Sequence, residues 1–276
     1  MSPLKSLSVL ALVLLSSASL TACEPQPPTL DWAIVQRIDL SAALDVEGVS
    51  VAGITVDPET GVRFVLETTG IYSIDGAGQA ELVLALADFP EPDVPLRSGF
   101  LDLAAMGGGR FALVAVGDGY LLDMNEGTLS QWFCYEPGWM GGQGTGDQSE
   151  WEQQSANLAY DASTDQILSA PLTLNDGNVL RSDVATFDGA GAGDLSWFQL
   201  ENGSENWFGG LALEPEGTLL LGAESNLFRY TMGSSELELL GSLEAYGVDE
   251  ITGLMYEPDS GHLMVTQNAE LLIFEM

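Results

Sequence analysis

Acidic and aromatic side chains gather in several short segments of the chain, where together they could bind a cation or a sugar. Calcium takes about six to eight oxygen ligands, which carboxylates supply. Paired carboxylates are also the groups with which glycosidases act. The candidate ligand-binding residues are Glu47, Arg97, Trp151, Asn157, Glu205, Trp207, Asp249 and Glu250. Because the chain holds 41 Asp and Glu, acidic loops without any function stay open as an alternative.

Few other catalytic groups are available. His262 is the single histidine and follows a turn at the start of a predicted strand, so we expect neither a Ser-His-Asp triad nor a histidine-based metal site. The glycine-rich stretch at 139–147 is followed by neither the Lys nor the Ser/Thr of a phosphate-binding loop. No catalytic residue can therefore be assigned, and calcium is the one cofactor that the acidic loops suggest.

The composition excludes whole classes of partner. The 276 residues carry 41 Asp and Glu against 7 Lys and Arg, a formal charge of −34. A chain with so few cations cannot neutralise a phosphate backbone, so we expect no nucleic-acid partner. Hydrophobic residues make up 46% of the chain, which is enough for a globular core.

The first residues are typical of an export signal. Lys5 precedes an apolar run at 7–15, which is too short to span a bilayer, and small and polar residues follow up to Cys23. The ending Leu20-Thr-Ala-Cys23 resembles the lipobox of bacterial lipoproteins. That resemblance implies a signal peptide at 1–22, a lipid on Cys23, a linker at 23–30 and a place in the cell envelope, on its periplasmic or outer side. A signal peptide with a coincidental Cys stays open as an alternative.

Five similar segments mark the beginnings of repeats. They start at Gly53, Asp102, Asn157, Gly210 and Gly253, which lie 43 to 55 residues apart. Each is a short apolar stretch that runs into a turn such as Asp57-Pro-Glu-Thr-Gly61, with further β-rich stretches behind it. In the first repeat these stretches are at 62–66, 70–74 and 81–86. Four strands in about fifty residues are typical of a β-propeller blade.

The predicted strands at the two ends of the chain can form one blade together. Only three strands are predicted in the last repeat, at 251–256, 262–266 and 271–274, while the strand at 33–38 has no partner in the first repeat. Pairing the two would close the ring and remove its exposed edges. We therefore predict an all-β propeller over 31–276, monomeric, with five four-stranded blades. Six blades stay open as an alternative.

The repeat resembles the broad propeller group of NHL, YncE-like and SdiA-regulated (YjiK-like) bacterial proteins. The segment from Gly253 to Thr266 is the closest match. The resemblance implies fold rather than activity. In the calcium-dependent lactonases of related shape, Asn157 would match an axial Asn, but Gly53-Ile54 and Gly209-Gly210 stand where Glu and Asp are needed.

The candidate residues belong to loops that run from an outer strand to the next inner strand, or lie beside them. Propeller topology places these loops on one face, so we predict that Glu47, Glu205 and Glu250 converge at the axis. The function that we predict is a surface-tethered, non-enzymatic binding or protein-interaction module. Its partners would be the membrane, through Cys23, and an envelope protein or glycan. A carboxylate-based hydrolase, glycosidase-like or lactonase-like, is the alternative.

Overall fold

The computed structural model describes residues 28–46, 48–92, 99–115, 118–134, 157–176, 179–188, 196–199, 208–231 and 237–276. No helix within these ranges is long and apolar enough to cross a membrane.

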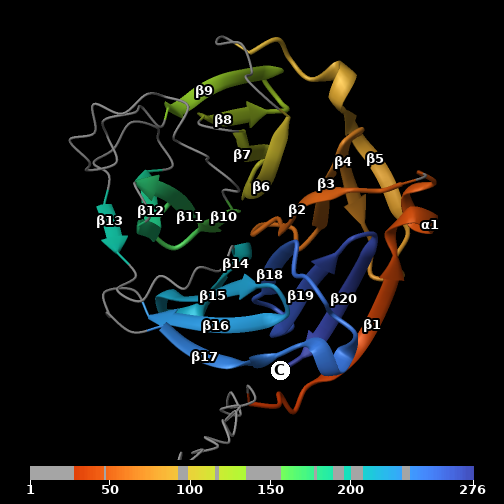
Figure 1. Ribbon diagram of the computed structural model, residues 1–276. Coiled ribbons are helices and arrows are strands. Elements are labelled where there is room, and N and C mark those ends of the chain that lie inside the picture. The colour runs from red at the N-terminus through yellow and green to blue at the C-terminus, as the bar shows by residue number, and fades with distance from the viewer. Residues whose placement is uncertain are drawn as a thin grey trace, which may run out of the picture.

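Strands form five antiparallel sheets of four strands each (Figure 1). Sheet 1 contains β2 (Val51–Val56), β3 (Arg63–Glu67), β4 (Gly70–Ile74) and β5 (Ala80–Ala85). Sheet 2 contains β6 (Phe100–Gly107), β7 (Arg110–Ala115), β8 (Asp118–Asp123) and β9 (Thr128–Cys134). Sheet 3 contains β10 (Asn157–Asp161), β11 (Gln166–Asp176), β12 (Val179–Asp188) and β13 (Ser196–Gln199).

Sheets 4 and 5 complete the set. Sheet 4 contains β14 (Phe208–Glu214), β15 (Thr218–Ala223), β16 (Asn226–Thr231) and β17 (Leu237–Ser242). Sheet 5 contains β18 (Gly253–Glu257), β19 (His262–Gln267), β20 (Glu270–Glu275) and β1 (Ala33–Asp39). The short helices are α1 (Leu40–Leu44), η1 (Leu86–Asp88), η3 (Pro215–Gly217) and η4 (Glu244–Tyr246).

The five sheets surround a common axis. Their innermost strands β2, β6, β10, β14 and β18 contact one another in that order, and β18 contacts β2. Strand β1 comes from the other end of the chain and pairs with β20, from Ala33 opposite Glu275 to Asp39 opposite Glu270. The all-β propeller arrangement that the repeats predict is confirmed.

Apolar side chains fill the space between neighbouring sheets. Strand β7 is buried from Phe111 to Ala115 because it has a sheet on either side. Phe111 meets Phe64 of sheet 1 edge to face, with ring centroids 5.1 Å apart. Strands such as β7 and β15 are stable because they bury both of their faces in this way, whereas the outer strands β5 and β17 stay partly exposed.

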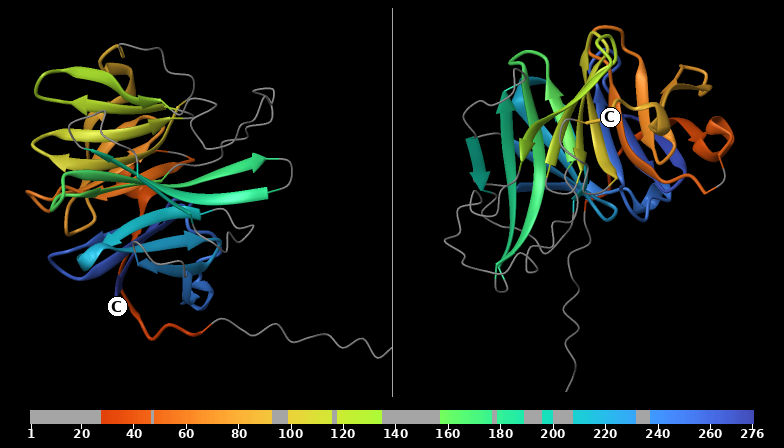
Figure 2. Two further views of the ribbon diagram at one scale, coloured as in Figure 1. Left: turned by 90° about the vertical axis from the view of Figure 1, so that its left-hand side faces the viewer. Right: turned by 90° about the horizontal axis from the view of Figure 1, so that it is seen from above.

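The strand order gives the ring two distinct faces. The cavity face carries the turns that follow the innermost strands, from Asp57 to Gly61 in sheet 1. The connection face carries the turns between second and third strands, together with the links between sheets such as α1 and η4. Figure 1 is viewed from the connection face, and the left view of Figure 2 shows the cavity face on its left side.

Candidate functional site

A cavity of about 760 Å³ opens on the cavity face. All five innermost strands contribute to its wall, through Thr55, Ala105, Ala159, Leu213 and Met255. Its volume lies within the range of about 300–1,000 Å³ that is usual for small-molecule sites. The cavity therefore belongs to the ring as a whole rather than to one sheet.

The charged side chains that line this cavity within the described ranges are all carboxylates. They are Asp57, Glu59, Asp161, Glu214, Glu257 and Asp259. Arg63 neutralises Glu257, and Arg229 neutralises Glu214 from 3.1 Å. The other four carboxylates have no arginine partner among the described residues, which makes the described wall of the cavity negative.

Two of these carboxylates also build the turns on which they stand. Oδ1 of Asp57 accepts the backbone N–H groups of Glu59 at 3.0 Å and Thr60 at 2.8 Å. Oδ1 of Asp161 accepts the backbone N–H of Ser163 at 2.9 Å, and Oδ2 accepts the hydroxyl of Thr164 at 2.8 Å. Aspartate favours turns because its short side chain reaches the backbone two residues on. The repeated acidic residue therefore has a structural role as well as a charge.

The ion pair of Glu257 with Arg63 joins the last sheet to the first. Nε of Arg63 lies 2.9 Å from Oε1 of Glu257, and Nη2 lies 3.1 Å from Oε2. The two side chains are only 14% and 11% exposed. Bidentate geometry and low exposure make this pair stronger than a typical surface pair.

Hydrogen bonds keep two cavity carboxylates ionised. Burial would raise the pKa of Glu257, but hydrogen bonds from Arg63 and Ser260 outweigh it and lower the pKa. Burial would likewise raise the pKa of Asp161, and hydrogen bonds from Ser163 and Thr164 lower it. A general acid needs a raised pKa, so neither group suits that role.

Aromatic rings lie beside the carboxylates. Tyr160 and Tyr256 both line the cavity. The hydroxyl of Tyr160 donates to Oδ1 of Asp165 at 2.9 Å. Burial, together with this hydrogen bond and the charge of Asp165, raises the pKa of Tyr160 to about 12, so its ring stays neutral. Aromatic rings next to carboxylates suit an organic cation, which is attracted by both.

A buried carboxyl group, Asp102 of β6, locks three of the innermost strands together. Its Oδ1 accepts the N–H of Leu103 at 2.7 Å, and its Oδ2 accepts the N–H of Leu158 in β10 at 2.6 Å. On the other side it fills the space left by Gly53 of β2. Burial raises the pKa of Asp102 well above its ordinary value, against the two backbone hydrogen bonds, which lower it. Asp102 does not line the cavity, so it acts in the fold.

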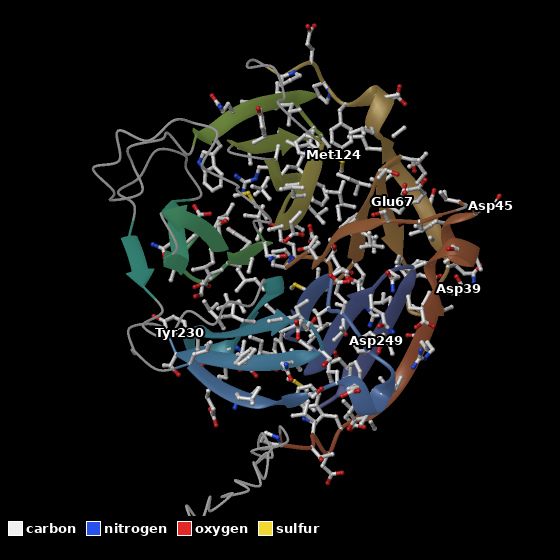
Figure 3. The ribbon with its side chains drawn as sticks, in the orientation of Figure 1. Asp39, Asp45, Glu67, Met124, Tyr230 and Asp249 are labelled. Carbon is white, nitrogen blue, oxygen red and sulfur yellow. The ribbon has the colours of Figure 1, made fainter. Side chains whose placement is uncertain are left out.

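The structure places three of the sequence-predicted residues. Asn157 is buried at the start of β10, with 5% of its surface exposed. Asp249 and Glu250 are exposed between η4 and β18 on the connection face, where Figure 3 shows Asp249. The backbone N–H of Asp249 donates to Oε1 of Gln267 at 3.1 Å. The structure therefore does not bring Asn157 onto the surface with the other two.

The remaining predicted residues lie outside the described ranges. They are Cys23, Glu47, Arg97, Trp151, Glu205 and Trp207. The convergence of Glu47, Glu205 and Glu250 at the axis thus stays a prediction. No group of three or more His, Cys, Asp or Glu within the described part of the chain is placed to hold a metal ion.

Sequence reasoning missed the cavity, although the signal was present. The repeated segments end in Asp57, Asp161, Glu214 and Glu257, and all four line the cavity. In the sequence these positions predict only turns. A ring of repeats brings equivalent positions together at the axis, so an acidic residue that recurs at one position of the repeat predicts a negative cavity there.

Comparison with known proteins gives the fold. No protein-family model matches the chain. No curated protein sequence matches it either. A chain of the nidogen/laminin complex superposes with a TM-score of 0.50 at 10% identity, over 81% of this chain and 78% of that one. The fold is a β-propeller.

Two further structures are similar to this propeller at lower scores. A luciferin-regenerating enzyme has a TM-score of 0.49 at 12% identity, over 79% of this chain and 68% of that chain. A chain of the mitotic checkpoint complex has a TM-score of 0.48 at 11% identity, over 99% of each chain. Identities this low concern the fold alone, so function must be argued from the site.

Proposed function

We propose that this propeller is a lipid-anchored binding module of the cell envelope whose axial cavity takes a positively charged ligand. The observation that carries the proposal is the cavity of about 760 Å³ in whose wall the charged residues, among those described, are carboxylates alone. Four of them have no arginine partner in the described part of the chain, and two tyrosine rings lie beside them. An ammonium or guanidinium group on a peptide or a small amine has the complementary charge.

The sequence supplies the rest of the proposal. The lipobox-like ending at Cys23 supports a lipid anchor, and the export signal supports a place in the envelope. The five sheets, whose innermost strands contact one another in a circle, support five blades in a monomeric ring. We expect Cys23→Ser to release the protein from the membrane fraction while its circular dichroism stays unchanged.

The loops on the connection face form a second possible site. Glu47, Arg97, Trp151, Glu205, Trp207, Asp249 and Glu250 stay candidate ligand residues there, and calcium stays a candidate ion. Asp102 is the one described carboxylate whose pKa is raised, and it is buried between the innermost strands, so it does not support a hydrolase on that face. The cavity face is therefore the first place to test for binding.

Thermal unfolding with added ligands tests the proposal. Spermidine, an arginine-rich peptide and calcium are each titrated at fixed ionic strength, so that screening of the acidic chain does not imitate binding. A ligand at about 100 times its Kd stabilises by about 2.7 kcal/mol, which for a domain of this size is about 5 to 10 °C in Tm. We expect a saturable rise with the organic cations. A rise with calcium alone would move the site to the connection face, and no rise beyond matched salt would contradict a cationic ligand.

A further inference from the structure

The first described residues are held against the outer edge of sheet 4. Thr29 pairs in parallel with Ser242, the last residue of β17. The hydroxyl of Tyr246 in η4 donates to the carbonyl of Leu30 at 2.6 Å and accepts the N–H of Trp32 at 3.0 Å. Residues 28–32, called the strap below, are thus fastened to β17 and η4 before β1 begins.

Aromatic packing joins the strap to sheet 5 as well. The Tyr246 ring meets the Phe274 ring edge to face, with centroids 5.3 Å apart. The Trp32 ring lies 6.2 Å from the same Phe274 ring. Arg37 of β1 adds a hydrogen bond of 3.1 Å from Nη2 to the carbonyl of Tyr246. The strap therefore spans the boundary between sheets 4 and 5.

The strap begins on the connection face. Ser242 ends β17 and η4 belongs to the link between sheets 4 and 5, and the left view of Figure 2 shows the described chain beginning on that side of the ring. The cavity opens on the opposite side. The tether and the cavity mouth are thus on opposite faces of the ring.

The chain before the strap is short. Five residue steps lead from Cys23 to Pro28, and an extended chain spans at most about 3.3–3.6 Å per residue, or about 17 Å. Within the strap the chain passes toward the cavity side, because Ala33 lies opposite Glu275 and Glu275 lies opposite His262, which follows a turn of the cavity face. The strap nevertheless begins at the connection face, so that face lies nearest along the chain to a lipid on Cys23.

We propose that the strap orients the propeller on the membrane, with the connection face toward the bilayer and the cavity turned away from it. This inference rests on the proposed lipid anchor at Cys23. It implies that the cationic group reaches the cavity from the aqueous side, on a soluble molecule or an opposing surface. A headgroup of the same bilayer cannot reach it.

The lysine content of the chain makes the orientation measurable. Lys5 is the only lysine and lies in the predicted signal peptide, so a lysine introduced into the mature chain is a unique amine label. Asp249→Lys places the label on the connection face and Asp259→Lys places it at the cavity, and both positions are exposed. The full-length lipidated protein is placed in phosphatidylcholine vesicles that contain a nitroxide-headgroup lipid. Uncharged vesicles avoid repulsion of the acidic connection face.

The intact mass of the mature protein is measured first. Acyl chains on Cys23 establish the anchor, and their absence overturns the anchor together with the orientation that rests on it. With the lipid present, we expect the nitroxide to quench a fluorophore at residue 249 and to leave one at residue 259 as bright as in nitroxide-free vesicles. Equal quenching at both positions, or quenching at residue 259 alone, overturns the orientation while the anchor stands.

Two tyrosine variants test the strap itself. Tyr246→Phe removes the hydroxyl that holds Leu30 and Trp32 but keeps the ring against Phe274, so we expect the difference between the two labels to shrink. Tyr160→Phe removes a hydroxyl on the cavity face and is expected to leave the difference unchanged. If Tyr246→Phe keeps the full difference, the strap does not set the orientation and the proposal is wrong.

Discussion

Gly53 is the position at which the packing of the ring can be tested most sharply. A Cβ added there would lie 1.8 Å from Oδ1 and 3.0 Å from Cα of Asp102. The Cα belongs to the backbone of β6 and cannot turn away, and the carboxyl group is held by the N–H groups of Leu103 and Leu158. Gly53→Ala must therefore push β2 away from β6 and also displace the carboxyl group from its place.

Both responses cost stability. Overpacking a filled core costs about 1–3 kcal/mol. Leaving a buried N–H group such as that of Leu158 without its acceptor costs about 1–3 kcal/mol more. We expect Gly53→Ala to lower the free energy of unfolding by about 2 to 6 kcal/mol, measured by urea denaturation monitored by tryptophan fluorescence and circular dichroism.

Gly76→Ala is the matched control. A Cβ at Gly76 meets nothing within 4 Å, and its φ is not positive. The substitution also restricts the unfolded chain, so we expect stability to stay level or to rise by about 0.4–1 kcal/mol. If Gly53→Ala proves as stable as Gly76→Ala, the innermost strands do not approach as described and the reasoning is refuted.

Three further predictions concern charge and closure. Glu257→Gln leaves the mostly buried Arg63 without its carboxylate, so we expect the free energy of unfolding, measured by urea denaturation, to fall by about 3 kcal/mol. Glu270→Gln removes the exposed pair with Arg37 and is expected to lower it by about 0–1 kcal/mol, and equal losses would contradict the difference in burial. Because the folded pKa of Asp102 lies above the ordinary 3.8, the folded state binds more protons, and its contribution to stability falls as pH rises from 3.8 through the raised pKa. Asp102→Asn is expected to remove this pH dependence of the free energy of unfolding in a pH series of unfolding measurements. An unchanged pH dependence would contradict the raised pKa of Asp102. Deleting residues 1–39 removes β1 and bares the edge of β20, so light scattering is expected to show association, and a stable monomer would argue against closure by β1.

The repeats predicted the strands well because alternation and turn chemistry are local. The strand predicted at 70–74 is β4 from Gly70 to Ile74, and the stretch predicted at 81–86 is β5 from Ala80 to Ala85. Pairing of the N-terminal strand followed from counting strands, and β1 does pair with β20. The local sequence pattern and the number of strands were thus enough to predict how the strands are arranged.

The site was harder to predict because it depends on contacts between distant segments. Arg63 and Glu257 are 194 residues apart and meet only because sheet 5 lies next to sheet 1. The density of charge in the sequence favoured the loops of the connection face, whereas the cavity lies on the other face, where the turns of four sheets line it together. Residues 28–30 of the strap were predicted as part of the linker and residues 31–32 as the start of the propeller, and the contacts of the strap with β17 and Tyr246 leave no periodic trace in the sequence.

The central claim, that the axial cavity binds an organic cation, is tested most directly by calorimetric titration of two isosteric double variants. Glu59→Gln with Asp259→Asn removes two of the four unpaired cavity carboxylates, and Asp249→Asn with Glu250→Gln removes the same charge from the connection face. With spermidine at an ionic strength of about 0.15 M, where charges screen within about 8 Å, we expect the cavity variant to bind about three- to tenfold more weakly than the unmodified protein. The connection-face variant is expected to bind as the unmodified protein does. Equal weakening in both variants, or no saturable binding at all, would contradict a cationic site in the cavity.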